Sequence, residues 1–115
     1  MGAGRDSLAG RLRELLAARG AAEVREVAMF GGRSFMVEGE MACAAREGEL
    51  LARVDPGRSE ELLALPGARP ALMGAGRAMG PSWIAVDGAA IADDAALLRG
   101  LDLALEAGAA RRGGR

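Results

Sequence analysis

The segment from Met29 to Met41 constrains the fold of this chain more than any other stretch. It reads Met-Phe-Gly-Gly-Arg-Ser-Phe-Met-Val-Glu-Gly-Glu-Met, with a pair of glycines near its start and a single glycine near its end. Glycine adopts the backbone angles that tight turns require, and the residues between these glycines are mostly apolar. The segment therefore predicts the end of one strand, a turn at Gly31-Gly32, a second strand, and a tight turn at Gly39 that leads into a third strand.

The spacing of apolar residues assigns the rest of the chain to helices and strands. Leucines that recur every three or four residues predict helices, with Asp6 or Ser7 capping the first and Asp93 capping the last. The helices are expected over 7–19, 58–65 and 93–107, and the strands over 23–30, 34–38, 41–46, 49–54 and 83–86. A chain of 115 residues in this order is typical of one two-layer α+β domain, with a core over 7–107 and a tail over 108–115.

The register of the hairpin formed by the second and third strands is left open by the sequence. A two-residue loop places Met36 opposite Met41. A three-residue loop places Val37 opposite Met41 and Phe35 opposite Cys43. Because a slip of one residue turns every side chain to the other face of the sheet, the two registers predict different cores.

The residue types that the chain lacks exclude several kinds of chemistry. It contains no His and no Lys, and Cys43 is its only cysteine. It therefore has no imidazole base or ligand, no lysine for a Schiff base, and no pair of thiols for a disulfide or a zinc site. Cys43 lies in the middle of a predicted strand and is expected to be structural. We expect a protein that is not an enzyme and that uses no metal or other cofactor.

Charge and hydropathy also limit the partners and the location of the protein. The formal net charge is −1, so no long-range field favours nucleic acid, and we expect no direct nucleic-acid binding. No apolar run approaches the roughly 18–20 residues that span a bilayer, and the N-terminal residues lack the features of a signal peptide. A single cysteine fits a reducing compartment. These features predict a cytoplasmic protein with no membrane partner.

The glycine pair supports one alternative hypothesis about function. Adjacent glycines can form a backbone nest that binds an anion, and the candidate site consists of Gly31, Gly32, Arg33 and, from a glycine-rich loop, Arg77. This hypothesis makes the protein a small anionic ligand binder, or an enzyme acting on such a ligand. The competing interpretation is a plain turn between strands, because no helix follows the glycines to add its dipole.

Several segments in succession resemble the signature of the TfoX (Sxy) N-terminal domain family. They are residues 29–32, 35–41, 48–54, 66–70 and 76–79, the last followed by the strand that begins at Trp83. The resemblance covers roughly residues 8 to 105. The chain departs from the usual pattern at Arg33 and Ser34, where the family has an apolar residue and glycine, and it lacks a lysine that the family carries near the last strand.

This resemblance implies a fold and a kind of function. The fold is an antiparallel five-stranded sheet with helices packed on it, in the order α-β-β-β-β-α-β-α, similar to secretion-chaperone-like sheets. Full-length members of the family regulate natural transformation competence and carry a second, C-terminal domain. The family offers no catalytic residues to transfer to this chain.

The predicted strands carry apolar side chains on both faces, although helices can cover only one. Met36, Met41 and Leu51 are therefore expected to form an exposed apolar patch, and such patches usually mark a partner site. We expect a non-catalytic cytoplasmic regulatory or protein-interaction module that uses this surface to bind a protein partner or to self-associate.

Overall fold

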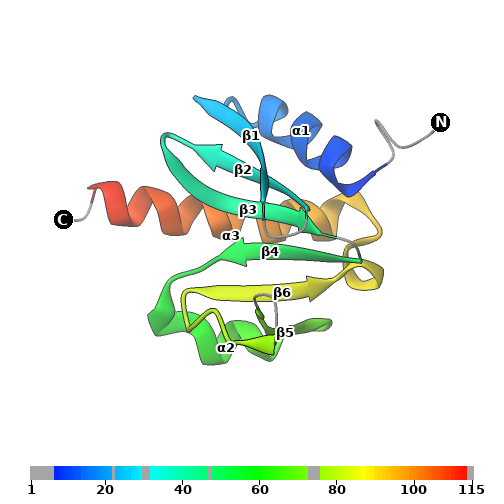
Figure 1. Ribbon diagram of the computed structural model, residues 1–115, viewed down its shortest axis with the longest axis vertical. Coiled ribbons are helices and arrows are strands. Elements are labelled where there is room, and N and C mark those ends of the chain that lie inside the picture. The colour runs from blue at the N-terminus through cyan, green and yellow to red at the C-terminus, as the bar shows by residue number, and fades with distance from the viewer. Residues whose placement is uncertain (1–6, 22, 30–31, 47, 73–75, 114–115) are drawn as a thin grey trace.

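The computed structural model describes residues 7–21, 23–29, 32–46, 48–72 and 76–113. In this part of the chain, three α-helices accompany one six-stranded antiparallel sheet (Figure 1). The helices are α1 (Leu8–Ala18), α2 (Ser59–Leu63) and α3 (Asp94–Gly113), with short 3-10 helices η1 (Pro56–Arg58) and η3 (Gly88–Ile91). The strands are β1 (Val24–Met29), β2 (Gly32–Val37), β3 (Glu40–Arg46), β4 (Glu49–Arg53), β5 (Ala68–Pro70) and β6 (Trp83–Asp87).

The helices form one layer and the sheet forms the other, which confirms the predicted two-layer α+β fold. The strands lie in the order β1-β2-β3-β4-β6-β5, and α3 crosses behind the middle of the sheet in Figure 1. The sheet has one strand more than the sequence predicts. The additional strand, β5, has three residues and pairs only with β6. So short a strand shows no alternation of apolar and polar residues that could have revealed it.

The last helix is longer than its sequence pattern indicates. Asp93 caps its start by accepting a hydrogen bond at 2.8 Å from a backbone N–H of the first turn, as predicted. The helix then continues through residues 108–113, which the sequence assigns to a tail. Gly108 is buried, and Arg111 forms an ion pair with Glu40 of β3. These tertiary contacts extend the helix past a glycine that would otherwise be read as its end.

The turn between β2 and β3 is the two-residue loop. Glu38 and Gly39 have φ angles of 52° and 86°, the left-handed values that a two-residue hairpin turn of type I′ requires. Met36 accordingly pairs with Met41, as the first of the two predicted registers requires.

A bulge then shifts the pairing, so that part of the second register is also present. Beyond the shift between Phe35 and Met36, Phe35 pairs with Cys43. Ala42 is the extra residue on β3, and Ala42 and Cys43 both contribute to the main core. A β-bulge has this effect because two residues on one strand oppose a single residue on its partner.

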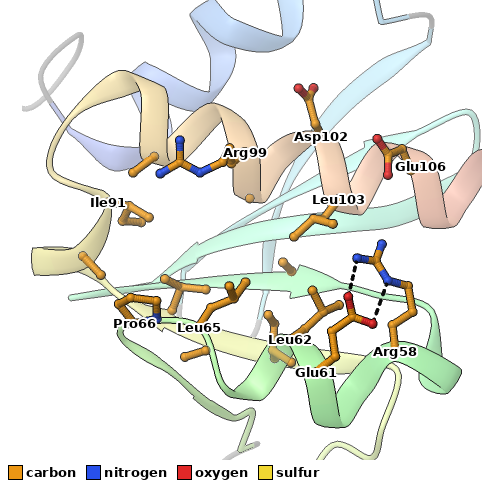
Figure 2. A pocket seen from close by; sticks show the side chains of 17 residues that line it. Arg58, Glu61, Leu62, Leu65, Pro66, Ile91, Arg99, Asp102, Leu103 and Glu106 are labelled. Carbon is orange, nitrogen blue, oxygen red and sulfur yellow. Dashed lines mark hydrogen bonds and ion pairs between the residues drawn. The ribbon is translucent and has the colours of Figure 1, made fainter.

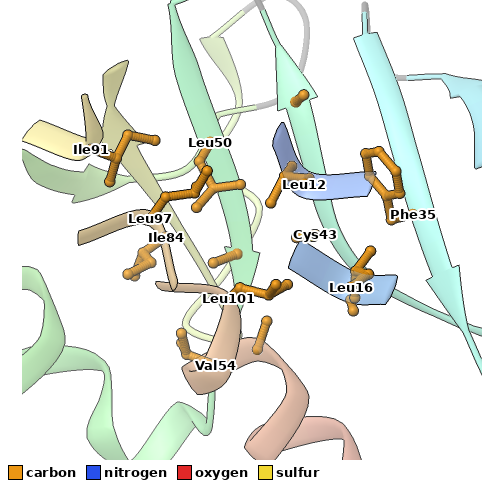
Figure 3. Packing of buried hydrophobic residues seen from close by; sticks show 14 of the residues in the cluster. Leu12, Leu16, Phe35, Cys43, Leu50, Val54, Ile84, Ile91, Leu97 and Leu101 are labelled. Atoms are coloured by element: carbon orange, nitrogen blue, oxygen red, sulfur yellow. The ribbon is translucent and has the colours of Figure 1, made fainter. Parts of the chain in front are cut away.

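The main core lies between the sheet and the helices (Figure 3). Its largest fully buried side chains come from two helices and three strands and are Leu12, Leu16, Phe35, Leu50, Ile84, Leu97 and Leu101. Polar contacts fix α1 to the beginning and middle of α3. Arg19 and Asp102 form an ion pair at 2.6 Å, and Arg11 and Asp94 form another at 3.1 Å.

A second, smaller apolar cluster lies on the opposite face of the sheet. Its buried members are Met41, Ala44, Leu51, Ala71 and Ala85. The described residues 71–72 and 76–82, here called the cover segment, supply Ala71 and the half-buried Met79 to this cluster. The backbone N–H of Met79 donates a hydrogen bond at 2.9 Å to the carbonyl of Ala71, so the two described parts of the cover segment are joined to each other on this face of the sheet.

The predicted exposed patch of Met36, Met41 and Leu51 is therefore wrong as a description of the surface. Leu51 is completely buried, Met41 is 8% exposed and Met36 is half-buried. The sequence analysis assumed that only helices could cover a face of the sheet. Here an irregular segment covers the second face, and no periodic pattern in the sequence indicates it.

Ser34 supports a prediction about stability. It is fully buried in β2, and its hydroxyl has no hydrogen-bond partner in the described part of the chain. We expect Ser34→Ala to raise the free energy of unfolding by about 1 kcal/mol, because a buried hydroxyl without a partner loses its hydration on folding and gains nothing in return. Urea unfolding followed by circular dichroism measures this change. A loss of stability in the variant would show that the hydroxyl is satisfied in solution.

Candidate functional site

A cleft of about 500 Å³ lies between α2 and α3, with the sheet as its floor (Figure 2). Its apolar lining comes from α2 and the residues after it, from β6, and from η3 and α3, and includes Leu62, Leu65, Ile84, Val86, Ile91 and Leu103. A further hollow of about 190 Å³ shares Leu62 and Leu103 with it and extends along α3. Volumes of several hundred Å³ with mostly apolar walls are typical of small-molecule sites.

Local sequence explains why the cleft remains open. α2 ends after one turn at Leu63, and Pro66-Gly67 then directs the chain into β5. Leu65 consequently lies beyond the end of the helix and is 46% exposed at the cleft. The sequence pattern predicts a helix over 58–65, whereas α2 ends two residues earlier.

Charged groups are distributed unevenly along the cleft. Figure 2 shows Arg58, Glu61 and Glu106 at one end and Arg99 towards the other, near Ile91. Arg58 and Glu61 form an ion pair at 3.0 Å, and the hydrogen bond from Arg58 lowers the pKa of the Glu61 carboxyl. Glu61 is therefore ionised at neutral pH and is not poised to act as a general acid.

Arg99 differs from the other charged groups of the cleft. Asp102, one turn along α3, forms an ion pair with Arg19, the residue that follows α1, and points away from α2 in Figure 2. Within the residues that the structure describes, Arg99 makes no hydrogen bond or ion pair. The cleft thus combines apolar walls with one cationic side chain that no neighbouring group neutralises.

The cover segment forms a second surface of interest. Leu72 is 45% exposed there, and Arg46 of β3 donates a hydrogen bond at 2.9 Å to its carbonyl oxygen. Half-buried Met36, Met79 and Trp83 pack against the apolar cluster beneath the segment. Of the predicted interaction surface, Met36 therefore remains accessible, while the exposed leucine of this face is Leu72, which the sequence pattern does not assign to that surface.

The four residues of the predicted anion site are not brought together by any described contact. Gly31 lies outside the described residues. Gly32 belongs to β2, where a Cβ atom would approach the carbonyl oxygen of Ala45 to 2.1 Å. Close strand packing therefore accounts for that glycine without an anion.

The two arginines of the predicted anion site lie on different elements. Arg33 is on β2, with its Nε 4.0 Å from a carboxylate oxygen of Glu26, so an acidic group already faces it. Arg77 is exposed on the cover segment. No hydrogen bond or ion pair joins the two side chains in the part of the chain that the structure describes, and a shared anion site at this pair stays a prediction.

Cys43 is completely buried in the main core. Burial raises the pKa of its thiol from 9.0 to about 12, because the thiolate would lose its hydration there. A thiol in this environment is not a nucleophile at neutral pH. Among the described residues, no cluster of three or more Cys, His, Asp or Glu side chains is arranged to hold a metal ion.

Three helices on one face of a six-stranded antiparallel sheet define a small α+β domain with two surface features, the cleft and the cover segment. A family model described as the TfoX N-terminal domain matches residues 14–108, which is most of the chain. The chain belongs to the TfoX N-terminal domain family, and the resemblance noted in the sequence is confirmed. No curated protein and no solved structure matched the chain in the corresponding searches. In the described part of the chain, no helix has the length and apolar character needed to cross a bilayer.

Proposed function

We propose that this protein is a non-catalytic cytoplasmic regulatory module that acts by binding another protein, as its resemblance to the N-terminal domain of the TfoX competence regulator suggests. The observation that supports the proposal most directly is the surface around the cover segment. There, the side chain of Leu72 is 45% exposed, and the carbonyl oxygen of the same residue accepts a hydrogen bond from Arg46. Leu72 adjoins Ala71, which belongs to the smaller apolar cluster, and contiguous exposed apolar surface is characteristic of partner sites.

Methionines make this surface suitable for contact with a protein. Met36 and Met79 are half-buried at its edge, and methionine adapts its shape to a partner more readily than branched side chains do. Arg53 lies 5.4 Å from the centre of the Trp83 ring, which adds a cation–π pair at the same face. Aromatic, methionine and arginine side chains are the types enriched at protein interfaces.

The non-catalytic part of the proposal rests on the state of the reactive groups. The buried Cys43 thiol is protonated at neutral pH, and the Glu61 carboxylate is held by Arg58. Neither group is available as a nucleophile or as a proton donor near a bound substrate.

We expect Leu72→Glu to abolish the interaction of the protein with its partner, because a carboxylate at the centre of an apolar contact must lose its hydration when the contact forms. The tagged chain and its variant are compared in a quantitative pull-down from bacterial lysate, and light scattering after size exclusion at ~100 µM tests self-association. A partner should be retained by the native chain, or appear as a second copy, and be lost from the variant.

Leu65→Glu provides the matched control. Leu65 has nearly the same exposure as Leu72, but it lies at the α2–α3 cleft on the other side of the sheet. The control changes the charge by the same amount and should retain the partner. A monomer whose set of captured proteins is identical for all three chains would refute docking at the cover segment.

A further inference from the structure

We propose that the α2–α3 cleft is a binding site for a small amphipathic carboxylate, a linear aliphatic acid whose chain occupies the cleft and whose carboxylate pairs with Arg99. This inference goes beyond the proposed protein docking, which concerns the opposite face of the sheet. It rests on the juxtaposition of an elongated apolar cleft and a guanidinium that has no partner among the described residues.

The walls of the cleft favour a ligand with an apolar chain. Leu62, Leu65 and Leu103 face the space between the helices (Figure 2). Ile84 and Val86 of β6 also line it. Burying an aliphatic chain against such walls is favourable by roughly 0.8 kcal/mol for each CH₂ group removed from water. A polar sugar or a nucleobase would instead meet few hydrogen-bond partners there.

The shape of the cleft favours a linear chain over a compact ring system. The hollow of about 190 Å³ beside Val54 and Ala107 continues the main cleft past Leu62 and Leu103. The two spaces together follow α3 from the neighbourhood of Arg99 towards Ala110. A chain anchored at Arg99 can therefore extend along the helix within apolar surroundings.

The distribution of charged groups along the cleft favours a ligand that carries a single negative charge at one end. Arg99 offers a planar set of N–H donors that matches a carboxylate. At the opposite end, Glu106 lies close enough to Arg58 to contribute to its electrostatic environment, and Arg58 is also paired with Glu61. These carboxylates oppose a ligand with several negative charges, such as a nucleotide, and favour an acid with one charge near Arg99.

Isothermal titration calorimetry of the full chain with sodium decanoate, below its micellar range, tests the proposal. Decanol and inorganic phosphate serve as control ligands, since the first has the chain without the charge and the second has the charge without the chain. We expect decanoate to bind saturably, decanol to bind more weakly, and phosphate not to bind. Binding of decanol as tight as that of decanoate would overturn the role of the carboxylate.

Two pairs of variants locate the site. Arg99→Ala should weaken decanoate binding about 10-fold, which is the low end of the effect expected for losing a hydrogen bond to a charged group. Arg77 is also an exposed arginine, but it lies on the cover segment, so Arg77→Ala should not change the affinity. Leu65→Glu should remove binding, whereas Leu72→Glu should leave it intact. An unchanged affinity in both Arg99→Ala and Leu65→Glu would show that the acid binds elsewhere and would refute the site.

The outcomes separate this proposal from the docking of a protein. If decanoate does not bind and Leu65→Glu instead loses a captured protein, the cleft is a protein-docking groove and the ligand proposal is wrong. If Leu72→Glu keeps every captured protein while decanoate binding depends on Arg99, the ligand site stands and docking at the cover segment fails. The variants Leu65→Glu and Leu72→Glu thus test the two proposals independently.

Discussion

Gly32→Ala is expected to lower the free energy of unfolding by about 3 kcal/mol, the upper part of the range for overpacking a well-packed site. A Cβ atom on residue 32 would lie 2.1 Å from the carbonyl oxygen of Ala45 and 3.0 Å from the Cα atom of Arg46. Both atoms belong to the backbone of β3, which is held by β2 on one side and by β4 on the other. The clash cannot be relieved by a side-chain rotation, so β2 and β3 must separate.

Urea or thermal unfolding of the purified chain measures this effect. The fall in stability corresponds to a decrease of roughly 10 °C in Tm for a domain of this size. Gly57→Ala is the matched control, because a Cβ atom there would make an ordinary contact of 3.4 Å with an Asp55 carboxylate oxygen. Its stability should change by less than about 1 kcal/mol. Equal effects of the two substitutions would show that the close approach of Gly32 to β3 does not exist in solution.

The elements that the sequence predicts well are those with a strong local signal. Leu12 and Leu16 recur at helical spacing and are buried in α1, and Leu97 and Leu101 are buried in α3 in the same way. The turn at Gly39 is likewise located by its glycine and by its position between two apolar runs. In each case the local pattern and the tertiary packing favour the same structure, which is the condition under which sequence patterns are dependable.

Features that depend on contacts between distant residues were not predictable from the sequence. The bulge at Ala42 and the burial of Leu51 beneath the cover segment have no periodic signature. The arginine that follows α1 is a further example. Arg19 reads as a solvated helix residue, yet it reaches Asp102 of α3 at 2.6 Å. An ion pair between residues so far apart in the chain becomes visible only after the helices have been placed.

The candidate sites differ in the same way: a local sequence pattern indicates one of them, and contacts between distant residues create the other. Two adjacent glycines predict a turn that could bind an anion. In the structure, however, Gly32 is required because a Cβ atom at this position would clash with the backbone of β3. No sequence pattern indicates the cleft, because its lining comes from many separate elements, none of which is unusual by itself. Arg99 also resembles any other arginine on a helix surface. What distinguishes it is that it makes no hydrogen bond or ion pair with any described residue while it lines an apolar cleft, and this is a property of the folded chain.

Cys43 should make the protein less stable as the pH rises above 9. The pKa of its thiol is about 12 in the folded protein, against 9.0 for an unperturbed thiol. Between these values the unfolded chain has lost the proton and the folded chain retains it. The unfolded state then binds fewer protons than the folded state, so the free energy of unfolding falls with increasing pH. A shift of this size predicts a fall of about 2 kcal/mol between pH 9 and pH 11.

The composition of the chain makes this alkaline response unusually simple to assign. The sequence contains no Lys and no Tyr, the side chains that ordinarily titrate in the same range, and arginine stays protonated throughout it. Urea unfolding at pH 9, 10 and 11 in the presence of a reductant should therefore report one thiol. Cys43→Ala is the matched variant. It should lose some stability at every pH through the missing sulfur atom, but its stability should stay level where that of the native chain declines. An equal decline in both chains would mean that the thiol is not buried in the folded protein, or that a group other than Cys43 controls the response.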